Sequence, residues 1–182
     1  MLYIMKRTTS VAVIFTLLCM LVDSKEEENV ALRGRATMSS TYIPDGPLSA
    51  AINAIDGNQD STFSHASCVT TDIEDYPWWR VDLLESHTIS RITITHRKGC
   101  CSSFSGAEIL IGDSLANNGN NNARCAKITS TSGGATETFH CNGMQGRYVN
   151  VALPGKNGVV TFCEIQIFGV PVNNKFCWDR SF

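Results

Sequence analysis

The sequence lacks the short motifs that mark many hydrolytic and zinc sites. It contains no G-x-S-x-G, no H-E-x-x-H and no C-x-x-C segment. It also lacks an excess of positive charge, since 15 Lys and Arg residues stand against 17 Asp and Glu residues, for a net charge of −2. There is no N-x-[ST] sequon either, so N-glycosylation is not expected. These absences argue against an enzyme and against a nucleic-acid-binding protein.

Long apolar runs are equally scarce. The one run of note, residues 11–22, follows Lys6 and Arg7 and precedes an acidic stretch. A transmembrane helix needs about 20 apolar residues, whereas this shorter run with a basic start suits a signal peptide. We therefore predict a signal peptide at 1–24, a short acidic linker at 25–28 and secretion, without membrane insertion.

Cysteine is abundant for a chain of this size. Eight cysteines are present, and Cys19 falls within the predicted signal peptide. In an oxidising compartment the other seven should pair and leave one over. His65 with Cys68, or His140 with Cys141, would make poor metal sites on spacing, and oxidised cysteines cannot act as catalytic thiolates. The residues alone do not decide which cysteines pair.

From residue 29 onward the apolar pattern has a period of two. Alternation is clear at 79–83, 89–95, 107–112, 148–153 and 164–168, and turn-rich segments at 53–64, 116–122, 131–135 and 154–158 separate these stretches. Only residues 48–55 are compatible with a short helix. The pattern predicts one all-β domain, an antiparallel β-sandwich or jelly roll, whose loops gather at its ends. A binding site is expected on those loops.

One loop carries oxygen ligands at close spacing. Asn53, Asp56 and Asn58 surround Gly57, which can adopt a tight backbone angle. Hard cations such as Ca²⁺ prefer carboxylate, amide and carbonyl oxygens. By itself the loop is also an ordinary Asn/Asp/Gly turn.

Seven separated motifs, in order, give a resemblance to a known family. They are NVALRGRAT at 29–37, AIDGN at 54–58, PWWRVDLL at 77–84, the Cys100-Cys101 pair, SGAEI at 105–109, GRYV at 146–149 and CEI at 163–165. Together they resemble the fucolectin (F-type lectin) family over nearly all of 29–170. The resemblance implies a galactose-binding-domain-like jelly roll with a structural calcium and a fucose-binding face.

The resemblance also implies which residues hold the calcium. They are the side chains of Asn53, Asp56, Asn58, Ser67 and Glu164 and the backbone carbonyl of Cys163. It further implies a Cys68–Cys163 disulfide, which would bring Ser67 and Glu164 together from distant parts of the chain. Asp56 and Glu164 would neutralise the charge of the ion.

Two further disulfides follow from the resemblance. It implies a Cys125–Cys141 disulfide and a bridge between the adjacent Cys100 and Cys101, whose flat sulfur surface would pack on the sugar. Cys177 lies in the tail, 171–182, beyond the family domain. A free thiol and an intermolecular bridge are both open for Cys177, and we favour a homo-oligomer linked through it.

The family's sugar-binding pattern is only partly kept. The family uses a His, an Arg-x-Asp segment and a later basic residue, because cationic donors bind sugar oxygens. Arg97 matches the first arginine, but Thr70 stands at the His position and Gly99 at the Asp position. Ser103 or Phe104 stands where the second basic residue belongs. His96 and Lys98 flank Arg97 on a strand, so we expect both to face solvent.

These features predict a secreted, calcium-dependent lectin-like protein for innate recognition of glycans. Fucose is the default ligand, and the sugar site around Arg97, Thr70, Cys100 and Cys101 is degenerate. The alternative is a secreted interaction module that keeps the scaffold but does not bind fucose.

Overall fold

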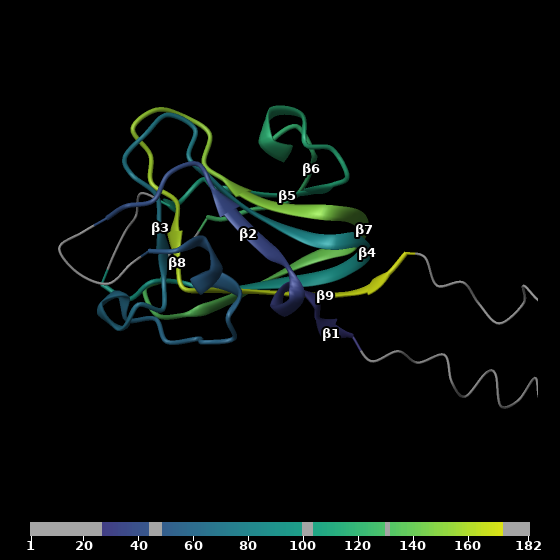
Figure 1. Ribbon diagram of the computed structural model, residues 1–182, viewed down its shortest axis with the longest axis horizontal. Coiled ribbons are helices and arrows are strands. Elements are labelled where there is room, and N and C mark those ends of the chain that lie inside the picture. The colour runs from purple at the N-terminus through teal and green to yellow at the C-terminus, as the bar shows by residue number, and fades with distance from the viewer. Residues whose placement is uncertain (1–26, 44–48, 100–103, 130–131, 173–182) are drawn as a thin grey trace, which may run out of the picture.

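Two long antiparallel strands form the centre of the fold. In the computed structural model, which describes residues 27–43, 49–99, 104–129 and 132–172, β4 spans Trp78–Thr95 and β7 spans Thr136–Ala152. They belong to a seven-stranded sheet with the order β1-β9-β4-β7-β5-β6, in which β2 also pairs with β4. A two-stranded sheet joins β3 to β8. The strand pairs are antiparallel, as the sequence predicts (Figure 1).

The remaining elements are short. The strands are β1 (Glu28–Asn29), β2 (Arg35–Met38), β3 (Val69–Thr70), β5 (Glu108–Gly112), β6 (Ala123–Lys127), β8 (Thr161–Phe162) and β9 (Glu164–Pro171). Within the described residues, short 3₁₀ helices lie between them: η1 (Val30–Arg33), η2 (Ala51–Ile55), η3 (Phe63–His65) and η5 (Ala116–Gly119). No helix of the described segments is long and apolar enough to cross a membrane.

The core fills the inner face of the larger sheet. Trp79 is fully buried, packs edge-on to Phe162 at 5.3 Å between ring centroids, and donates its indole N–H to the carbonyl of Ala51 at 2.9 Å. Phe104 stacks on the same Phe162 at 5.9 Å. Because η2 accepts the Trp79 hydrogen bond, the loop that follows η2 is fixed against the core.

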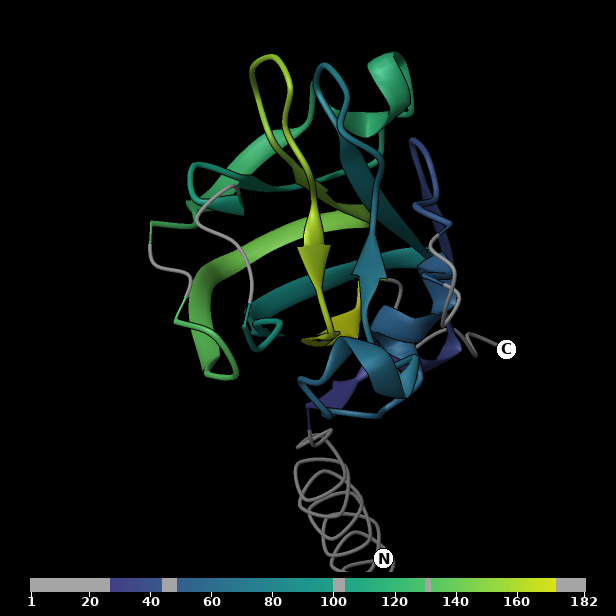
Figure 2. The same cartoon turned by 90° about the vertical axis from the view of Figure 1, so that its left-hand side faces the viewer.

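The small sheet stands at one end of the sandwich. Figure 2 shows β3 and β8 side by side in front of the curved strands of the larger sheet. Residues 56–66 lie at the foot of this pair, between η2 and β3. The predicted loop of oxygen ligands is therefore held at the end of the fold where distant segments meet.

The larger sheet includes residues just outside the predicted domain, 29–170. Glu28 pairs with Gly169 in the β1–β9 ladder, and β9 continues to Pro171. The predicted signal peptide at 1–24 lies outside the described residues, as does the tail from residue 173, which includes Cys177.

Candidate binding sites at one end of the sandwich

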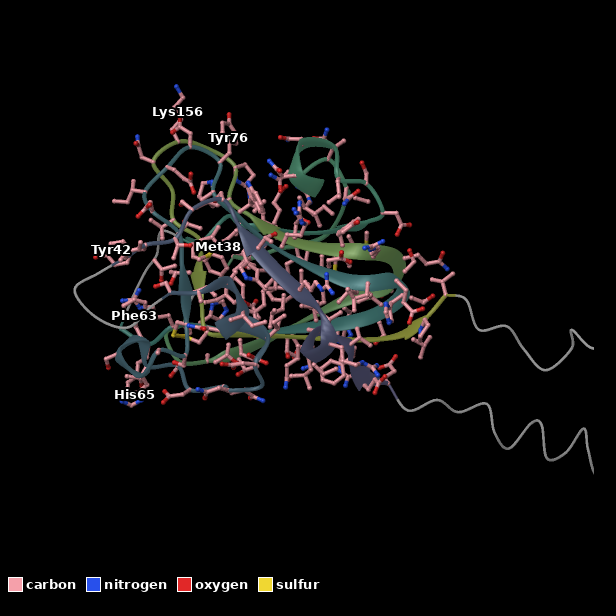
Figure 3. The ribbon with its side chains drawn as sticks, in the orientation of Figure 1. Met38, Tyr42, Phe63, His65, Tyr76 and Lys156 are labelled. Carbon is pink, nitrogen blue, oxygen red and sulfur yellow. A yellow bond between two sulfur atoms is a disulfide. The ribbon has the colours of Figure 1, made fainter. Side chains whose placement is uncertain are left out.

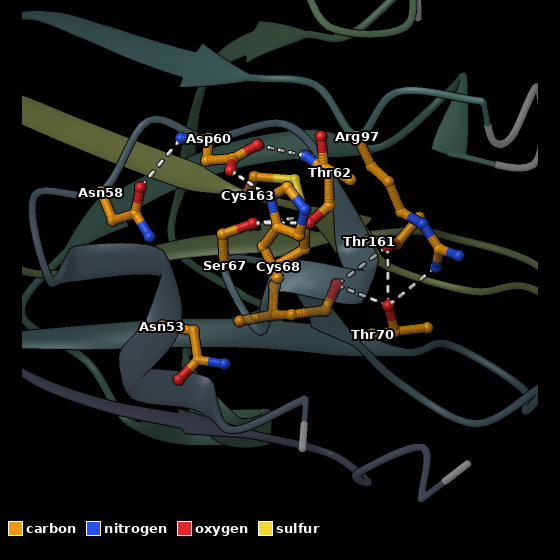
Figure 4. Close-up of a disulfide and its surroundings, with 12 residues drawn as sticks. Asn53, Asn58, Asp60, Thr62, Ser67, Cys68, Thr70, Arg97, Thr161 and Cys163 are labelled. Atoms are coloured by element: carbon orange, nitrogen blue, oxygen red, sulfur yellow. Dashed lines mark hydrogen bonds and ion pairs between the residues drawn. A yellow bond between two sulfur atoms is a disulfide. The ribbon is translucent and has the colours of Figure 1, made fainter. Parts of the chain in front are cut away.

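A disulfide joins the two segments that the calcium prediction needs. Cys68 and Cys163 are bonded across 95 residues, with their Cα atoms 3.6 Å apart. Each is flanked by a predicted ligand, Ser67 before Cys68 and Glu164 after Cys163. Figure 4 shows Ser67 beside the disulfide. A second disulfide, Cys125–Cys141, joins β6 to β7. The predicted Cys100–Cys101 bridge lies outside the described residues.

Glu164 is a buried carboxylate with one oxygen unused. The residue is 0% exposed, its Oε1 accepts a hydrogen bond from the Gly57 amide at 3.2 Å, and its Oε2 is buried without a hydrogen-bond partner. Burial, followed by the nearby charge of Asp56, raises the pKa of Glu164 to about 8. A charged group in this position is costly unless a cation or a donor meets it.

The other predicted ligands lie on the adjoining loop. Asp56 caps the end of η2, and its Oδ1 accepts a hydrogen bond from the Asn58 amide at 2.8 Å. Asn58 accepts in turn from the Asp60 amide at 3.1 Å, and Ser67 donates to the carbonyl of Thr62 at 3.0 Å. The Nδ2 of Asn53 donates to the carbonyl of Ala66 at 2.9 Å. Figure 4 shows Asn53, Asn58 and Ser67 around the disulfide.

This donor set fits a hard cation. It consists of carboxylate, amide, hydroxyl and carbonyl oxygens, the ligands that Ca²⁺ prefers, and it includes the orphaned oxygen of Glu164. Within the described segments no three His, Cys, Asp or Glu side chains gather as a metal site. Cys68 and Cys141 are both oxidised, so neither can serve as a thiolate ligand beside His65 or His140.

Arg97 lies beside the loop of predicted calcium ligands rather than alone on the surface. Its guanidinium stacks on the ring of Phe63 at 3.8 Å from the ring centroid, and its Nη1 donates to Thr70 Oγ1 at 3.4 Å. Its Nε is buried without a hydrogen-bond partner, and burial lowers its pKa from the ordinary value. Thr70 also bonds with the Thr161 hydroxyl at 2.8 Å (Figure 4). The fold thus brings Arg97 and Thr70 together, as the sugar-site prediction requires.

The structure offers no replacement for the family's Asp or second basic residue at the described positions of the sugar pattern. Phe104 is 1% exposed and stacks inside the core, so it offers nothing to a ligand. Gly99 adopts a positive φ of 73°, and a Cβ built there would meet no atom within 4 Å. Ser103 lies outside the described residues. Of the basic residues in the family's sugar-binding pattern, the described part of the chain therefore retains Arg97.

The expectation that His96 faces solvent is wrong. His96 is 3% exposed, contacts Glu137 at 3.1 Å and lies edge-on to Phe104. Strand alternation does not extend to this segment, because β4 ends at Thr95 and His96 is buried whereas Lys98 is exposed. The error came from reading a histidine at a strand end as a surface residue, whereas the inward position next to the core was available to it.

Two contacts of this site were not predicted. The first is Phe63, the first residue of η3, which supports Arg97. The second is the Asp60–His65 pair at 2.6 Å, in which the hydrogen bond from His65 is the main cause that lowers the pKa of Asp60 to about 2. Figure 3 shows Phe63 and His65 at the same lower corner of the molecule. Neither contact leaves a sequence signal, because each depends on how the loop folds.

The fold and the end-of-sandwich site define a class of carbohydrate-binding β domains. Residues 53–151 match the family model described as "NedA-like, galactose-binding domain". A structure of the lectin domain of lectinolysin complexed with Lewis B antigen is 28% identical, with a TM-score of 0.64 over 78% of this chain and 96% of that chain.

Curated relatives narrow the class. Fucolectin-4 of Anguilla japonica is 52% identical over 155 residues, which cover 83% of this chain and 86% of the relative. The crystal structure of an F-lectin (fucolectin) from Morone saxatilis (striped bass) serum is 48% identical with a TM-score of 0.75, over 79% of this chain. This chain spans just under half of that protein, 47%. The chain belongs to the fucolectin family, whose members are carbohydrate-binding proteins and not enzymes.

Proposed function

We propose that this protein is a secreted, calcium-stabilised lectin that binds fucose-bearing glycans, in the innate recognition of foreign surfaces. Its relatives are named fucolectins, and one matching structure comes from a serum protein. Secretion is also supported by the predicted signal peptide and by disulfides of the kind formed in oxidising compartments.

The state of Arg97 is the observation that carries the sugar proposal. Its guanidinium is fixed by Phe63 and Thr70, and its buried Nε lacks an acceptor. A ring oxygen or hydroxyl of a sugar would supply that acceptor, and hydrogen bonds from a charged donor are stronger than neutral ones. Arg97 would therefore orient the sugar, with Thr70 lining the same position.

For calcium, the orphaned Oε2 of Glu164 is the supporting observation. We propose that Asn53, Asp56, Asn58, Ser67 and Glu164 hold the ion through their side chains and Cys163 through its carbonyl. When bound, calcium would neutralise the buried carboxylate. Phe63 lies in the segment between η2 and β3 that also carries Asn58. The bound ion would therefore also hold Phe63 in place against Arg97.

A second candidate is an interaction module without fucose binding. It is favoured by the inward position of Phe104 and by the absence of a carboxylate at Gly99. Each lost hydrogen bond to a charged group costs about 1.5–3 kcal/mol. The two candidates make opposite predictions for the glycan-binding experiment that follows.

Arg97→Ala is expected to abolish the fucose signal of the full secreted chain on a glycan array in calcium buffer. The change removes the one cation that the site retains, while Thr70 and the core are left unaltered. The measurement is binding of wild type and variant to fucosylated and non-fucosylated glycans, with and without a chelator.

Arg91→Ala is the matched control. Arg91 also stacks on a phenyl ring at 3.8 Å, that of Phe168, but it pairs with Glu27 and lies away from the Arg97 site. Its loss should leave the array unchanged. Fucose binding that survives Arg97→Ala would place the sugar elsewhere, and a wild type silent on every glycan under calcium would favour the second candidate.

A further inference from the structure

A second concave site lies away from Arg97. A cleft of about 580 Å³ opens between η5 on one side and the loops before β4 and after β7 on the other. Its principal polar and aromatic lining residues are Tyr76, Trp78, Glu108, Asn117, Asn118 and Asn120. Figure 1 shows η5 and these loops rising on the same side of the larger sheet. We refer to it as the Trp78 cleft, and its volume falls within the usual range of small-molecule sites.

The Trp78 cleft is separate from the predicted fucose site. Figure 3 shows Tyr76 at the upper edge of the molecule and Phe63 at the lower left corner. Trp78 is also on the outer face of β4, opposite the buried Trp79. A ligand in this cleft would not meet Arg97.

The η5 wall of the cleft is held by hydrogen bonds from side chains of β4 and β7. The carbonyl of Asn118 accepts hydrogen bonds from Arg80 Nη1 at 2.8 Å and from Asn150 Nδ2 at 2.9 Å. Asn150, which is 0% exposed, also donates to Asn120 Oδ1 at 2.9 Å. Gly119 allows this close approach, because a Cβ there would lie 2.8 Å from Asn150 Oδ1. The cleft is therefore preformed, which lowers the entropic cost of binding.

Backbone strain gathers at the same cleft. Tyr76, Asn117 and Asn118 have φ values of 55°, 50° and 57°, in the left-handed region. Asparagine tolerates this region, but an aromatic residue rarely adopts it. On the opposite wall the amide of Tyr76 donates to the carbonyl of Gly155 at 2.9 Å and holds the strained residue in place. Such strain persists mainly where the surroundings impose it, often at binding sites.

The chemistry of the lining suits an uncharged, hydroxyl-rich ligand. Tyr76 is 61% exposed and Trp78 is half-buried. The guanidinium of Arg80 lies over the Trp78 ring at 5.1 Å from its centroid, so the surface for stacking is the ring of Tyr76 and the part of Trp78 that Arg80 does not cover. Within the described segments the indole N–H of Trp78 and the side-chain amide of Asn118 make no hydrogen bond, so both are left to a ligand or to water. Glu108 is already paired with Arg124, so its charge is offset. Aromatic rings bind the apolar face of a pyranose, and amides bind its hydroxyls.

We propose that the Trp78 cleft is a second carbohydrate site, which takes a neutral pyranose stacked on Trp78 and Tyr76 and hydrogen-bonded to Asn118. One chain would then hold two glycans, one at each site. The inference rests on the cleft alone and stands whether or not Arg97 binds fucose.

The test uses the full secreted chain carrying Arg97→Ala, so that the predicted fucose site contributes nothing. Three neutral probes are titrated separately: methyl β-D-galactopyranoside, methyl β-D-glucopyranoside and N-acetyl-D-glucosamine. At least one should shift the indole N–H resonance of Trp78 in NMR spectra, with a Kd of about 1 mM. A Trp78→Phe variant identifies that resonance among the three tryptophans.

Two added substitutions, Tyr76→Ala and Asn118→Ala, should each weaken the probe at least about tenfold, which corresponds to one lost contact. Ile73→Ala is the control, because Ile73 is 73% exposed on the same loop but does not line the cleft. The proposal is wrong if none of the neutral probes shifts the indole resonance, or if the shifts are the same in all three variants. A stronger response to N-acetylneuraminic acid would overturn the neutral ligand class.

Discussion

Replacing Cys68 and Cys163 together with alanine is expected to lower the free energy of unfolding by about 4–5 kcal/mol. The bridge closes 95 residues of chain, and the loss grows with the length of the closed loop because the unfolded state gains entropy. Both cysteines are 0% exposed, so the substitutions also remove packed atoms. Urea unfolding of the oxidised wild type and of the double variant measures the difference.

The Cys125–Cys141 bridge provides the comparison. It closes only 16 residues, so its removal by the same double substitution should cost about 3 kcal/mol. Removing the Cys68–Cys163 bridge should also weaken the proposed calcium binding, because Ser67 and Glu164 are the direct neighbours of the two cysteines. Removing the Cys125–Cys141 bridge should leave calcium binding unchanged. Equal losses of stability and unchanged calcium affinity in both variants would contradict this view of the Cys68–Cys163 bridge.

Calcium at about one hundred times its Kd is expected to stabilise the folded protein by about 2.7 kcal/mol. For a chain of this size that is a rise in Tm of about 5–10 °C. Glu164→Gln should remove most of this rise, because it deletes the charge that the proposed ion would neutralise. Calorimetry in calcium and in EDTA, with elemental analysis of the purified protein, makes the measurement.

The metal-free protein should also show a distinctive dependence on pH. The folded-state pKa of Glu164, about 8, lies above its ordinary value of 4.5, so protonation favours the folded state. This contribution is fully present below about pH 4.5 and is lost as the pH rises through about 8. In EDTA the stability should therefore fall over that window, and the gain from calcium should be larger at pH 8 than at pH 6.

Glu164→Gln should flatten this dependence without lowering Tm in EDTA at pH 8, since no buried charge remains. Glu85→Gln, on an exposed residue of β4, should behave as wild type. If calcium raises the Tm of wild type and Glu164→Gln equally, or if neither responds and no metal is found, Glu164 does not hold the ion.

The alternating pattern predicted the fold class but not the lengths of the strands. Residues 79–83 and 89–95 appear as separate strands in the sequence, yet β4 contains both and crosses the gap with a register shift and a positive φ of 72° at Leu84. Likewise β7 begins at Thr136 and includes Asn142 and Gly143, both with positive φ. Polar and left-handed residues interrupt the period of two, whereas backbone pairing with a neighbouring strand continues through them.

The candidate sites were likewise predicted only in part. Loop chemistry and family motifs indicated the set around Asp56 and Glu164, and they marked Phe104 as an unsuitable partner for a sugar. The support that Phe63 gives Arg97 was not foreseen, because no local pattern links residues 34 positions apart on different loops. The Trp78 cleft was missed for the same reason, since its aromatic and amide residues come from separate segments.

The stacking of Arg97 on Phe63 bears on the thermodynamics of ligand capture. Fixing an arginine side chain costs about 1.5–2 kcal/mol of rotamer entropy. Phe63 and Thr70 impose that loss while the chain folds, before any ligand arrives. Calorimetric titration of a sugar at this site should therefore show a favourable enthalpy with little opposing entropy from the arginine, and Phe63→Ala should add an entropic penalty even where the enthalpy is kept.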